Sequence, residues 1–261
     1  MAQASLPPRK SRWLLRAALL ILLLTALWAT QRPTWQHDAP RHFPWAVADY
    51  RLAHATHRIL PTGQIELEID HLPLTGITPE MLAWWYRVLP ISTVEVNGTS
   101  YPLYHIFHLT EHGQLWVEEP ATDGSAGMGE GSLVARREWF GPFDSEGAGR
   151  VISIAPEGMT VHPEVAGVQI GEIRHLFSAT PTGSQYRVES LIGVDWPIIA
   201  PLLNAVLRKT TFSEPMLAEW KRHQIEEVSM LNHYLPQLYA QRGDGYNFRL
   251  PETQTFKTGA Q

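Results

Sequence analysis

The segment from Ser213 towards Tyr234 constrains the fold of this chain more than any other, because its pattern is that of one long amphipathic helix. Ser213 offers an N-cap with Glu214 in the first turn, and Pro236 is expected to kink or end the helix. Steps of four, three, four, three, one and three connect the residues of one face, which are Met216, Trp220, His223, Glu227, Met230, Leu231 and Tyr234. Another layer of the protein must cover this face.

That layer is predicted to be a sheet. Residues 65–69 alternate between apolar and acidic side chains, as in a strand with one wet face. Further strand-like runs span 133–137, 151–154, 168–177 and 185–192, and no long helices alternate with them, which favours antiparallel pairing. We therefore predict an α+β fold, in which a curved antiparallel sheet grips the long C-terminal helix. This is the helix-grip arrangement of Bet v 1 and START proteins.

Two smaller elements are predicted before this sheet. Thr78 caps a short helix with Pro79 at its first position, and the helix is expected to stop at Pro90. Asn97-Gly98 is a hairpin-type turn, and the aromatic run 101–108 is interpreted as the strand that follows it.

The N-terminus has the pattern of a membrane-directed segment. Three basic residues within the first 12 positions precede an apolar, leucine-rich run from Ala17 to Ala29. Leu27 and Trp28 crowd the site where a signal peptidase would need small residues, so an uncleaved anchor is favoured over a cleaved signal. A transmembrane helix is expected here, with the main domain on the extracytoplasmic, periplasmic side.

These features divide the chain into three parts. Residues 1–30 are interpreted as the anchor or signal segment, residues 31–60 as a linker, and residues 61–250 as a metal-dependent hydrolase domain.

Composition limits the chemistry of any functional site. The chain has no cysteine, so a metal could be bound only by His, Asp or Glu, and 12 histidines are present. The formal net charge is −5 and basic residues form no long run beyond the N-terminus, which argues against nucleic acid as a partner. The oligomeric state is not encoded in any pattern we recognise.

His223 and Glu227 are ionisable residues in the middle of the apolar helix face. Side chains at i and i+4 lie one above the other on a helix, so this pair can point at one ion. A buried carboxylate must be protonated, paired with a cation or bound to a metal. A hydrogen bond between the two residues inside the core is the simpler explanation.

Two other segments could complete a metal site. Residues 107–112 contain His108, Glu111 and His112 at the end of the predicted aromatic strand, and Glu138 stands near the end of another strand. One His and one Glu from these segments would give a sphere of two histidines and two carboxylates, which suits zinc or a similar divalent ion.

The sequence resembles the diacetylphloroglucinol and phloretin hydrolases, zinc enzymes that cleave the carbon–carbon bond between an acyl group and a phenolic ring. The resemblance spans residues 60–240 and is carried by residues 78–85, by residues 107–112, by the region of Glu138 and by residues 220–228 with 235–239 behind them. It implies zinc ligands at His108, Glu138, His223 and Glu227. The block 107–112 departs from the family pattern at Phe107, Leu109 and Glu111, so His112 is the alternative to His108, either as ligand or as a residue behind the ligands.

The resemblance also implies a function. The expected activity is metal-dependent hydrolysis of a C–C bond in a small acylated aromatic substrate, with His175 as proton donor, Tyr101 as a hydrogen-bonding residue and His112 as a further candidate in the site. Two alternatives stay open. One is a non-catalytic helix-grip protein that binds a hydrophobic ligand at the membrane, and the other is a hydrolase of ester or amide bonds, although no familiar protease, esterase or nucleotide motif occurs.

Overall fold

The structure is a computed structural model that describes residues 36–251. The chain divides after Gln36 into two units, and the second one contains the elements of secondary structure described here. Its main element is a ten-stranded antiparallel sheet, in which eight strands follow the order β1-β2-β12-β11-β9-β8-β7-β6. The strands of this sheet are β1 (His54–Ile59), β2 (Ile65–Asp70), β3 (Leu74–Thr75), β6 (His112–Glu119), β7 (Leu133–Phe140), β8 (Phe143–Ala155), β9 (Gly158–Val165), β10 (Val168–Gln169), β11 (Gly171–Thr180) and β12 (Gly183–Ile192).

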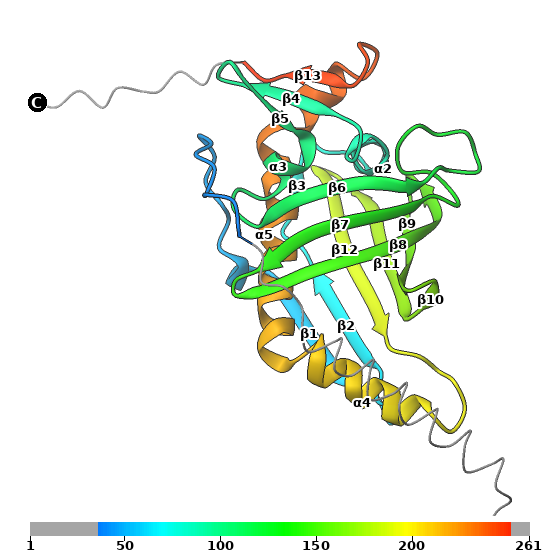
Figure 1. Ribbon diagram of the computed structural model, residues 1–261. Coiled ribbons are helices and arrows are strands. Elements are labelled where there is room, and N and C mark those ends of the chain that lie inside the picture. The colour runs from blue at the N-terminus through cyan, green and yellow to red at the C-terminus, as the bar shows by residue number, and fades with distance from the viewer. Residues whose placement is uncertain (1–35, 252–261) are drawn as a thin grey trace, which may run out of the picture. The chain divides into compact units, whose positions relative to one another are not determined.

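The sheet curves around the long helix α5 (Glu214–Ala240), as Figure 1 shows. The predicted helix-grip fold is therefore confirmed. The hydroxyl of Ser213 accepts the backbone N–H of Met216 and caps the helix as expected. Pro236 does not end the helix, which continues to Ala240, because the carbonyl that loses its bond belongs to the exposed residue Asn232 and can be hydrated.

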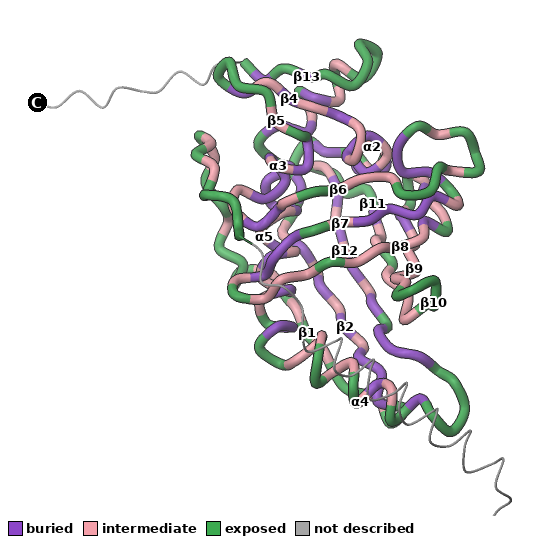
Figure 2. The backbone as a smooth tube through the Cα atoms, viewed as in Figure 1, coloured by how far each residue is buried: buried purple, intermediate pink, exposed green. Residues whose placement is uncertain are grey.

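The core lies between the concave face of the sheet and α5. Side chains of β2 alternate between buried and half-buried, and those of β12 do the same, so each strand turns one face inward (Figure 2). Trp220, Leu231 and Tyr234 of α5 are almost fully buried against this face. Each large apolar side chain buried in this way contributes about 1.5–3 kcal/mol to stability.

Smaller elements close one end of the sheet. Helix α2 (Pro79–Val88) is capped by Thr78 as predicted, and the hairpin turn at Asn97-Gly98 joins β4 (Thr93–Val96) to β5 (Thr99–Pro102). Strand β13 (Asn247–Arg249) pairs with β4 in a separate three-stranded sheet.

The predicted strand 101–108 is wrong beyond Pro102. Residues Leu103–Phe107 form the short helix α3, because Leu103, Ile106 and Phe107 have helical spacing and turn together into the core. The next strand, β6, begins only at His112.

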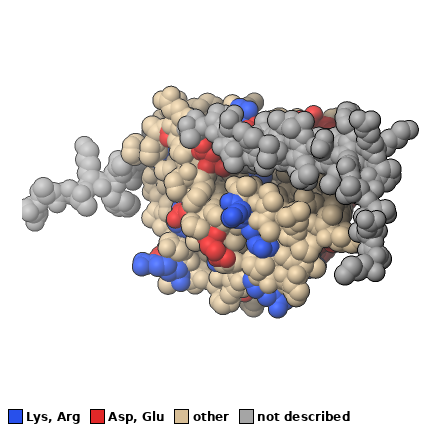
Figure 3. All heavy atoms as spheres, turned by 60° about the horizontal axis from the view of Figure 1, so that its bottom comes forward, with Lys and Arg blue, Asp and Glu red and all other residues tan. Residues whose placement is uncertain are grey.

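A fourth helix lies at the far end of β12. Helix α4 (Ala200–Thr210) is attached through the buried Asn204, whose amide donates to the carbonyls of Thr62 and Val194. The chain also has the single turn η1 (Tyr50–Leu52) before β1. On the face shown in Figure 3, basic and acidic side chains are dispersed among uncharged residues.

The expectation of a transmembrane helix, and with it the membrane-anchored location, is corrected. Within residues 36–251 no helix is long and apolar enough to cross a membrane. The predicted anchor, residues 1–30, lies outside the described residues. Strand β1 lies inside the range interpreted as a linker, residues 31–60, and pairs with β2 along its whole length.

Candidate metal centre

The register between two strands brings the first half of the candidate site together. His112, the first residue of β6, is paired directly with Glu138 on β7. Side chains of paired residues in an antiparallel sheet project from the same face. His112 and Glu138 therefore both point to the concave side, and both are buried.

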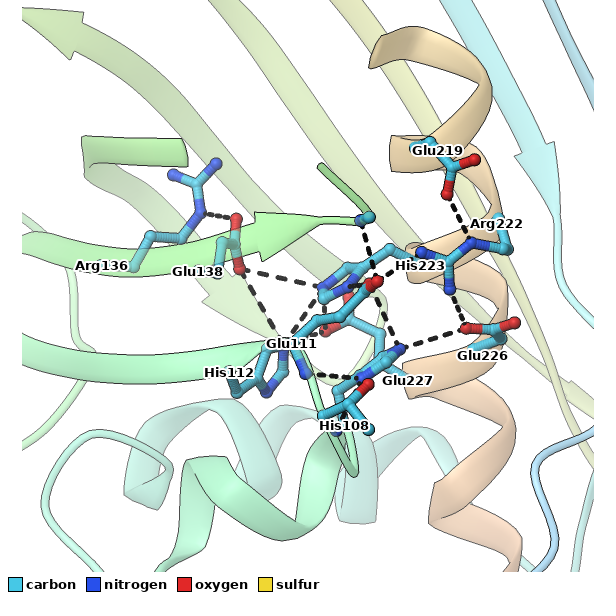
Figure 4. Close-up of polar contacts among 12 residues, drawn as sticks. His108, Glu111, His112, Arg136, Glu138, Glu219, Arg222, His223, Glu226 and Glu227 are labelled. Carbon is cyan, nitrogen blue, oxygen red and sulfur yellow. Dashed lines mark hydrogen bonds and ion pairs between the residues drawn. The ribbon is translucent and has the colours of Figure 1, made fainter. Parts of the chain in front are cut away.

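Helix α5 supplies the second half. His223 and Glu227 lie one turn apart on the helix face that the sheet covers, as the sequence predicted (Figure 4). The Nε2 atom of His223 lies 3.1 Å from Nε2 of His112, and Oε2 of Glu227 lies 3.2 Å from His112 Nε2 and 3.7 Å from His223 Nε2. Oε2 of Glu138 is 3.9 Å from each of the two Nε2 atoms.

The ligand atoms of His112, His223 and Glu227 lie within 4.8 Å of one another, as around one ion, and Glu138 extends this group from 3.9 Å away. Four atoms bound tetrahedrally at about 2.1 Å from zinc lie about 3.4 Å from one another. We call His112, Glu138, His223 and Glu227 the four-residue cluster.

The hydrogen bonds of the two histidines fix their tautomers. Nδ1 of His112 lies 2.7 Å from the backbone carbonyl of Tyr104, and Nδ1 of His223 lies 2.8 Å from the carboxylate of Glu111. A carbonyl and a carboxylate only accept, so each Nδ1 carries the hydrogen. The Nε2 atoms of the neutral rings then present lone pairs towards each other, and a cation between them would turn this repulsion into attraction.

Burial favours the uncharged forms of the two histidines and of Glu227. Burial, and then the neighbouring His108, hold the pKa of both His112 and His223 well below its usual range, so both rings are neutral at pH 7. Burial, and then the charge of Glu138, raise the pKa of Glu227 well above its usual range. A positive charge at the cluster is what would keep Glu227 ionised.

His108, the ligand implied by the family resemblance, lies outside the four-residue cluster. Its Nδ1 accepts the backbone N–H groups of Thr110 and Glu111, and its Nε2 lies 3.2 Å from the carboxylate of Glu226. Both nitrogens are therefore used in hydrogen bonds. The ring stacks on His223 at 4.5 Å between centroids. Strand register puts His112, the alternative ligand named from the sequence, opposite Glu138, so the geometry favours His112 over His108 as the partner of Glu138 and Glu227.

Glu111 holds His223 in place. Its carboxylate accepts from Nδ1 of His223, from the guanidinium of Arg222 at 2.5 Å and from the backbone N–H of Gly141 at 2.9 Å. Gly141 has a φ of 55°, and a Cβ there would lie 3.1 Å from the carboxylate of Glu219. Glycine is therefore needed at this turn between β7 and β8. A second group of possible ligands, His108, Glu111 and His223, coincides with these hydrogen bonds.

Tyr104 belongs to the site, although the sequence analysis did not identify it. Its hydroxyl donates to Oε2 of Glu138 at 2.5 Å, and its ring stacks on that of His112 with 3.7 Å between centroids. The assignment of residues 101–108 to a strand hid this contact, since only the helical turn α3 places Tyr104 above His112. Tyr101, the predicted hydrogen-bonding residue, lies on β5 and packs edge-on against Phe43.

His175 lies on the concave side, in a chain of hydrogen bonds. Its Nδ1 is 2.6 Å from the hydroxyl of Tyr186, which is 2.5 Å from the hydroxyl of Tyr86. Burial lowers the pKa of His175 to about 4, so the ring is neutral at pH 7. Glu227 is close enough that its charge, after burial, raises the pKa of Tyr86. The ring of Phe107 lies 6.3 Å from the ring of Tyr86 and 5.8 Å from that of His112, so this hydrogen-bonded chain lies near the cluster.

The segment before β1 also reaches the site. Arg41 donates from Nη2 to the backbone carbonyl of His112 at 2.9 Å, and its own N–H donates to the carbonyl of Leu109. His37 stacks on Trp139 at 4.4 Å. This part of the predicted linker thus supports the segment that carries His112.

Comparisons with known proteins give no family. Neither the protein-family models nor the curated proteins include a match to this sequence. Among solved structures, the protein named Ara h 8.0201 is 12% identical with a TM-score of 0.40, and the match covers 67% of this chain and 97% of that protein. A START superfamily protein from Mycobacterium smegmatis is 12% identical with a TM-score of 0.38, covering 67% and 99%. The KanY protein is 11% identical with a TM-score of 0.40, covering 66% and 95%. Similarities at this level say nothing about ligand or activity.

Proposed function

We propose that the four-residue cluster binds a divalent metal ion, with zinc the best fit, and that the protein is a metal-dependent hydrolase. The observation that carries the proposal is the pair of neutral imidazoles whose unprotonated Nε2 atoms face each other at 3.1 Å, with two carboxylates within 3.9 Å. Two histidines and two carboxylates form a nitrogen and oxygen donor set that zinc accepts. A protonated Glu227 could donate to the Nε2 atom of only one of the two imidazoles, which would leave the other Nε2 atom without a donor among residues 36–251.

A bound divalent ion would supply Lewis acidity at the cluster. The chain itself holds the ligands in orientation, since Glu111 and the carbonyl of Tyr104 each fix one imidazole. Tyr104 donates its hydroxyl proton to Glu138 at 2.5 Å, and the hydroxyls of Tyr86 and Tyr186, 2.5 Å apart, carry further protons. These hydroxyls are the groups in the site that could donate hydrogen bonds to a substrate oxygen.

The substrate class follows from the family resemblance and from the lining of the site. Phenolic and imidazole rings surround the cluster, which suits a flat aromatic substrate with polar substituents. We propose a small acylated aromatic compound, hydrolysed at the bond between the acyl group and the ring. The hydroxyl of Tyr186 is the proposed proton donor to the ring carbon, and the proton released by the attacking water would restore it. His175, the donor expected from the family resemblance, is neutral at pH 7 and would position this hydroxyl instead.

Metal content and turnover of three proteins test this proposal. The wild-type chain should contain about one zinc per molecule, and His223→Ala should lose the metal together with hydrolysis of acylated phenols. His233→Ala is the matched control, because His233 is an exposed histidine on the same helix, bonded to the carbonyl of Ala46. Full metal occupancy in His223→Ala, or no metal in the wild type after growth with zinc, would sink the proposal.

A non-catalytic ligand-binding protein is the second candidate. The observation in its favour is that two side chains on the inner side of the sheet and helix keep accessible surface, 34% for Arg136 and 13% for Glu227. Burial is nevertheless the largest influence on the pKa of each group, so both lie inside the protein. Room for a ligand between sheet and helix would explain both. This candidate predicts tight binding of an aromatic ligand, unchanged in His223→Ala, without turnover.

A further inference from the structure

Arg136 is a cation on the inner face of the sheet, beside the four-residue cluster. Residues alternate along β7, so Arg136 shares the concave face with Glu138, while Arg137 points outward and pairs with Glu146. The Nε atom of Arg136 donates to Oε1 of Glu138. Figure 4 shows the two terminal nitrogens of the guanidinium directed away from that carboxylate.

These terminal nitrogens have no protein acceptor in the described part of the chain. Within residues 36–251, the only hydrogen bond and ion pair of the Arg136 side chain is the one from Nε to Glu138. One third of the side-chain surface, 34%, is accessible. Guanidinium groups have five N–H donors, so four are unused here.

The neighbouring strand leaves space for the guanidinium. Gly147 on β8 is paired with Arg136, and a Cβ at Gly147 would lie 3.1 Å from Nη1 of Arg136. The guanidinium thus lies over a position without a side chain. The accessible surface lies on the inner side of the sheet, because Arg136 projects from the same face of β7 as the buried Glu138.

Charge balance favours an anion at this position. With a divalent ion bound, Glu138 and Glu227 would coordinate it as carboxylates, and the two charges of the ion would neutralise both. Arg136 would then be left with an uncompensated positive charge in the interior, which is costly unless an anion is bound. A guanidinium fork matches the two oxygens of a carboxylate, with which it forms parallel hydrogen bonds.

We infer that Arg136 is the anion subsite of the proposed active site and that the substrate carries a carboxylate. This inference rests on the proposed function for the identity of the reaction centre, and it adds the substrate class, an aromatic carboxylic acid. A competing view is that Arg136 serves only to neutralise Glu138.

Calorimetric titration with two matched probes separates these views. The probes are 4-hydroxybenzoate and 4-hydroxybenzamide, which differ in the charge of one group, and the full chain is titrated as purified with its metal content measured in the same sample. We expect wild type to bind the acid at least about tenfold more tightly than the amide, the factor that corresponds to about 1.4 kcal/mol. Equal affinity for the two probes in wild type overturns the inference without any variant.

Substitutions then locate the preference. Arg136→Gln should abolish the preference for the acid while the affinity for the amide stays within about twofold, and Arg136→Lys, which keeps the charge but not the fork, should retain part of it. Arg137→Gln is the matched control on the outer face and should bind both probes as wild type does. A preference that survives in Arg136→Gln overturns the inference. If Arg136→Gln does not fold, the ratio of acid to amide affinity in Arg136→Lys decides. An unreduced ratio there would contradict a bidentate role for the guanidinium.

The metal measurement keeps the two proposals apart. A metal-free wild type that still prefers the acid would contradict the metal centre and support the anion subsite. A zinc-loaded wild type that does not prefer the acid would support the metal centre and contradict the anion subsite.

Discussion

The Nε2 atoms of His112 and His223 lie 3.1 Å apart while the opposite nitrogen of each ring donates to an oxygen. Neither Nε2 atom therefore carries a hydrogen, and the short contact is not a hydrogen bond. Because burial keeps both rings neutral at pH 7, the contact is repulsive unless a cation or a proton donor such as the Glu227 carboxyl lies beside the two nitrogens. The two residues come from a strand and a helix 111 positions apart, so the fold as a whole maintains the contact.

Exchanging the two candidate histidines for alanine distinguishes them as ligands. His112→Ala removes one of four donors, and we expect its zinc content to fall below about a tenth of the wild-type value. His108→Ala removes only hydrogen bonds to Glu226 and to backbone N–H groups, so it should keep nearly all of its zinc. Metal analysis of the purified variants measures this, with circular dichroism to show that both fold. The reverse pattern would restore His108 as the ligand.

Glu111→Gln tests the support behind His223. The glutamine keeps the shape of the side chain but loses the charge that fixes and polarises the imidazole, so we expect zinc affinity to fall about 10- to 100-fold with the ligands intact. Competition with a chelator of known affinity measures the change. Glu226→Gln is the control, since Glu226 contacts His108 and Arg222 but neither imidazole of the cluster. An equal loss of zinc affinity in both variants would show a general effect of negative charge and contradict a specific role of Glu111 behind His223.

Removal of the metal should lower the thermal stability. An ion that binds only the folded chain stabilises it by about 2.7 kcal/mol at a free concentration of 100 times its Kd, which for a domain of this size corresponds to roughly 5–10 °C in Tm. We expect EDTA to remove this increment and zinc to restore it in the wild type. His112→Ala should show no response to either. An identical Tm with and without EDTA in a protein shown to lose its zinc would contradict this expectation.

The helix side of the site could be predicted from the sequence, and the sheet side only in part. His223 and Glu227 were found because the 3.6-residue period of a long helix fixes which side chains share a face. Glu138 was one of the candidate carboxylates in the predicted strands, and the family resemblance singled it out. The choice between His108 and His112 depended on strand register, which a sequence does not specify where a short helix can replace a strand.

The segment that forms helix α3 was predicted as a strand, and this error also hid a residue of the site. Its apolar residues suit either a strand or one helical turn, and packing of Leu103 and Phe107 into the core decides for the helix. Only that turn brings Tyr104 over His112, so Tyr104 escaped prediction. Arg136 escaped because inward-facing charge is visible only once the neighbouring strands, and Gly147 among them, are known.

His71 provides a test of the interior that does not involve the metal. This histidine is 4% exposed, and neither of its ring nitrogens has a hydrogen-bond partner among residues 36–251. Burial lowers its pKa from 6.5 to about 3. The unfolded chain therefore binds a proton from pH 6.5 downward while the folded chain does not.

The sign of the pH effect follows from this difference. Above pH 6.5 both states are neutral at His71 and the group adds no pH dependence. As the pH falls from 6.5 towards 3, the unfolded state gains protons first, and His71 lowers the free energy of unfolding by about 1.4 kcal/mol per pH unit. His71→Leu removes this slope, and at pH 7.5 it should be neutral or stabilising, because the ring it replaces has no hydrogen bond to lose.

Urea unfolding of wild type and His71→Leu at pH 7.5, 6.0 and 5.0 measures the effect. We expect the stability difference between the two proteins to be small at pH 7.5 and to grow in favour of the variant by about 1.4 kcal/mol between pH 6.0 and 5.0. Other groups titrate equally in both proteins and cancel in the difference. Parallel pH profiles would show that His71 is protonated in the folded chain, and hence that water or an acceptor reaches its ring.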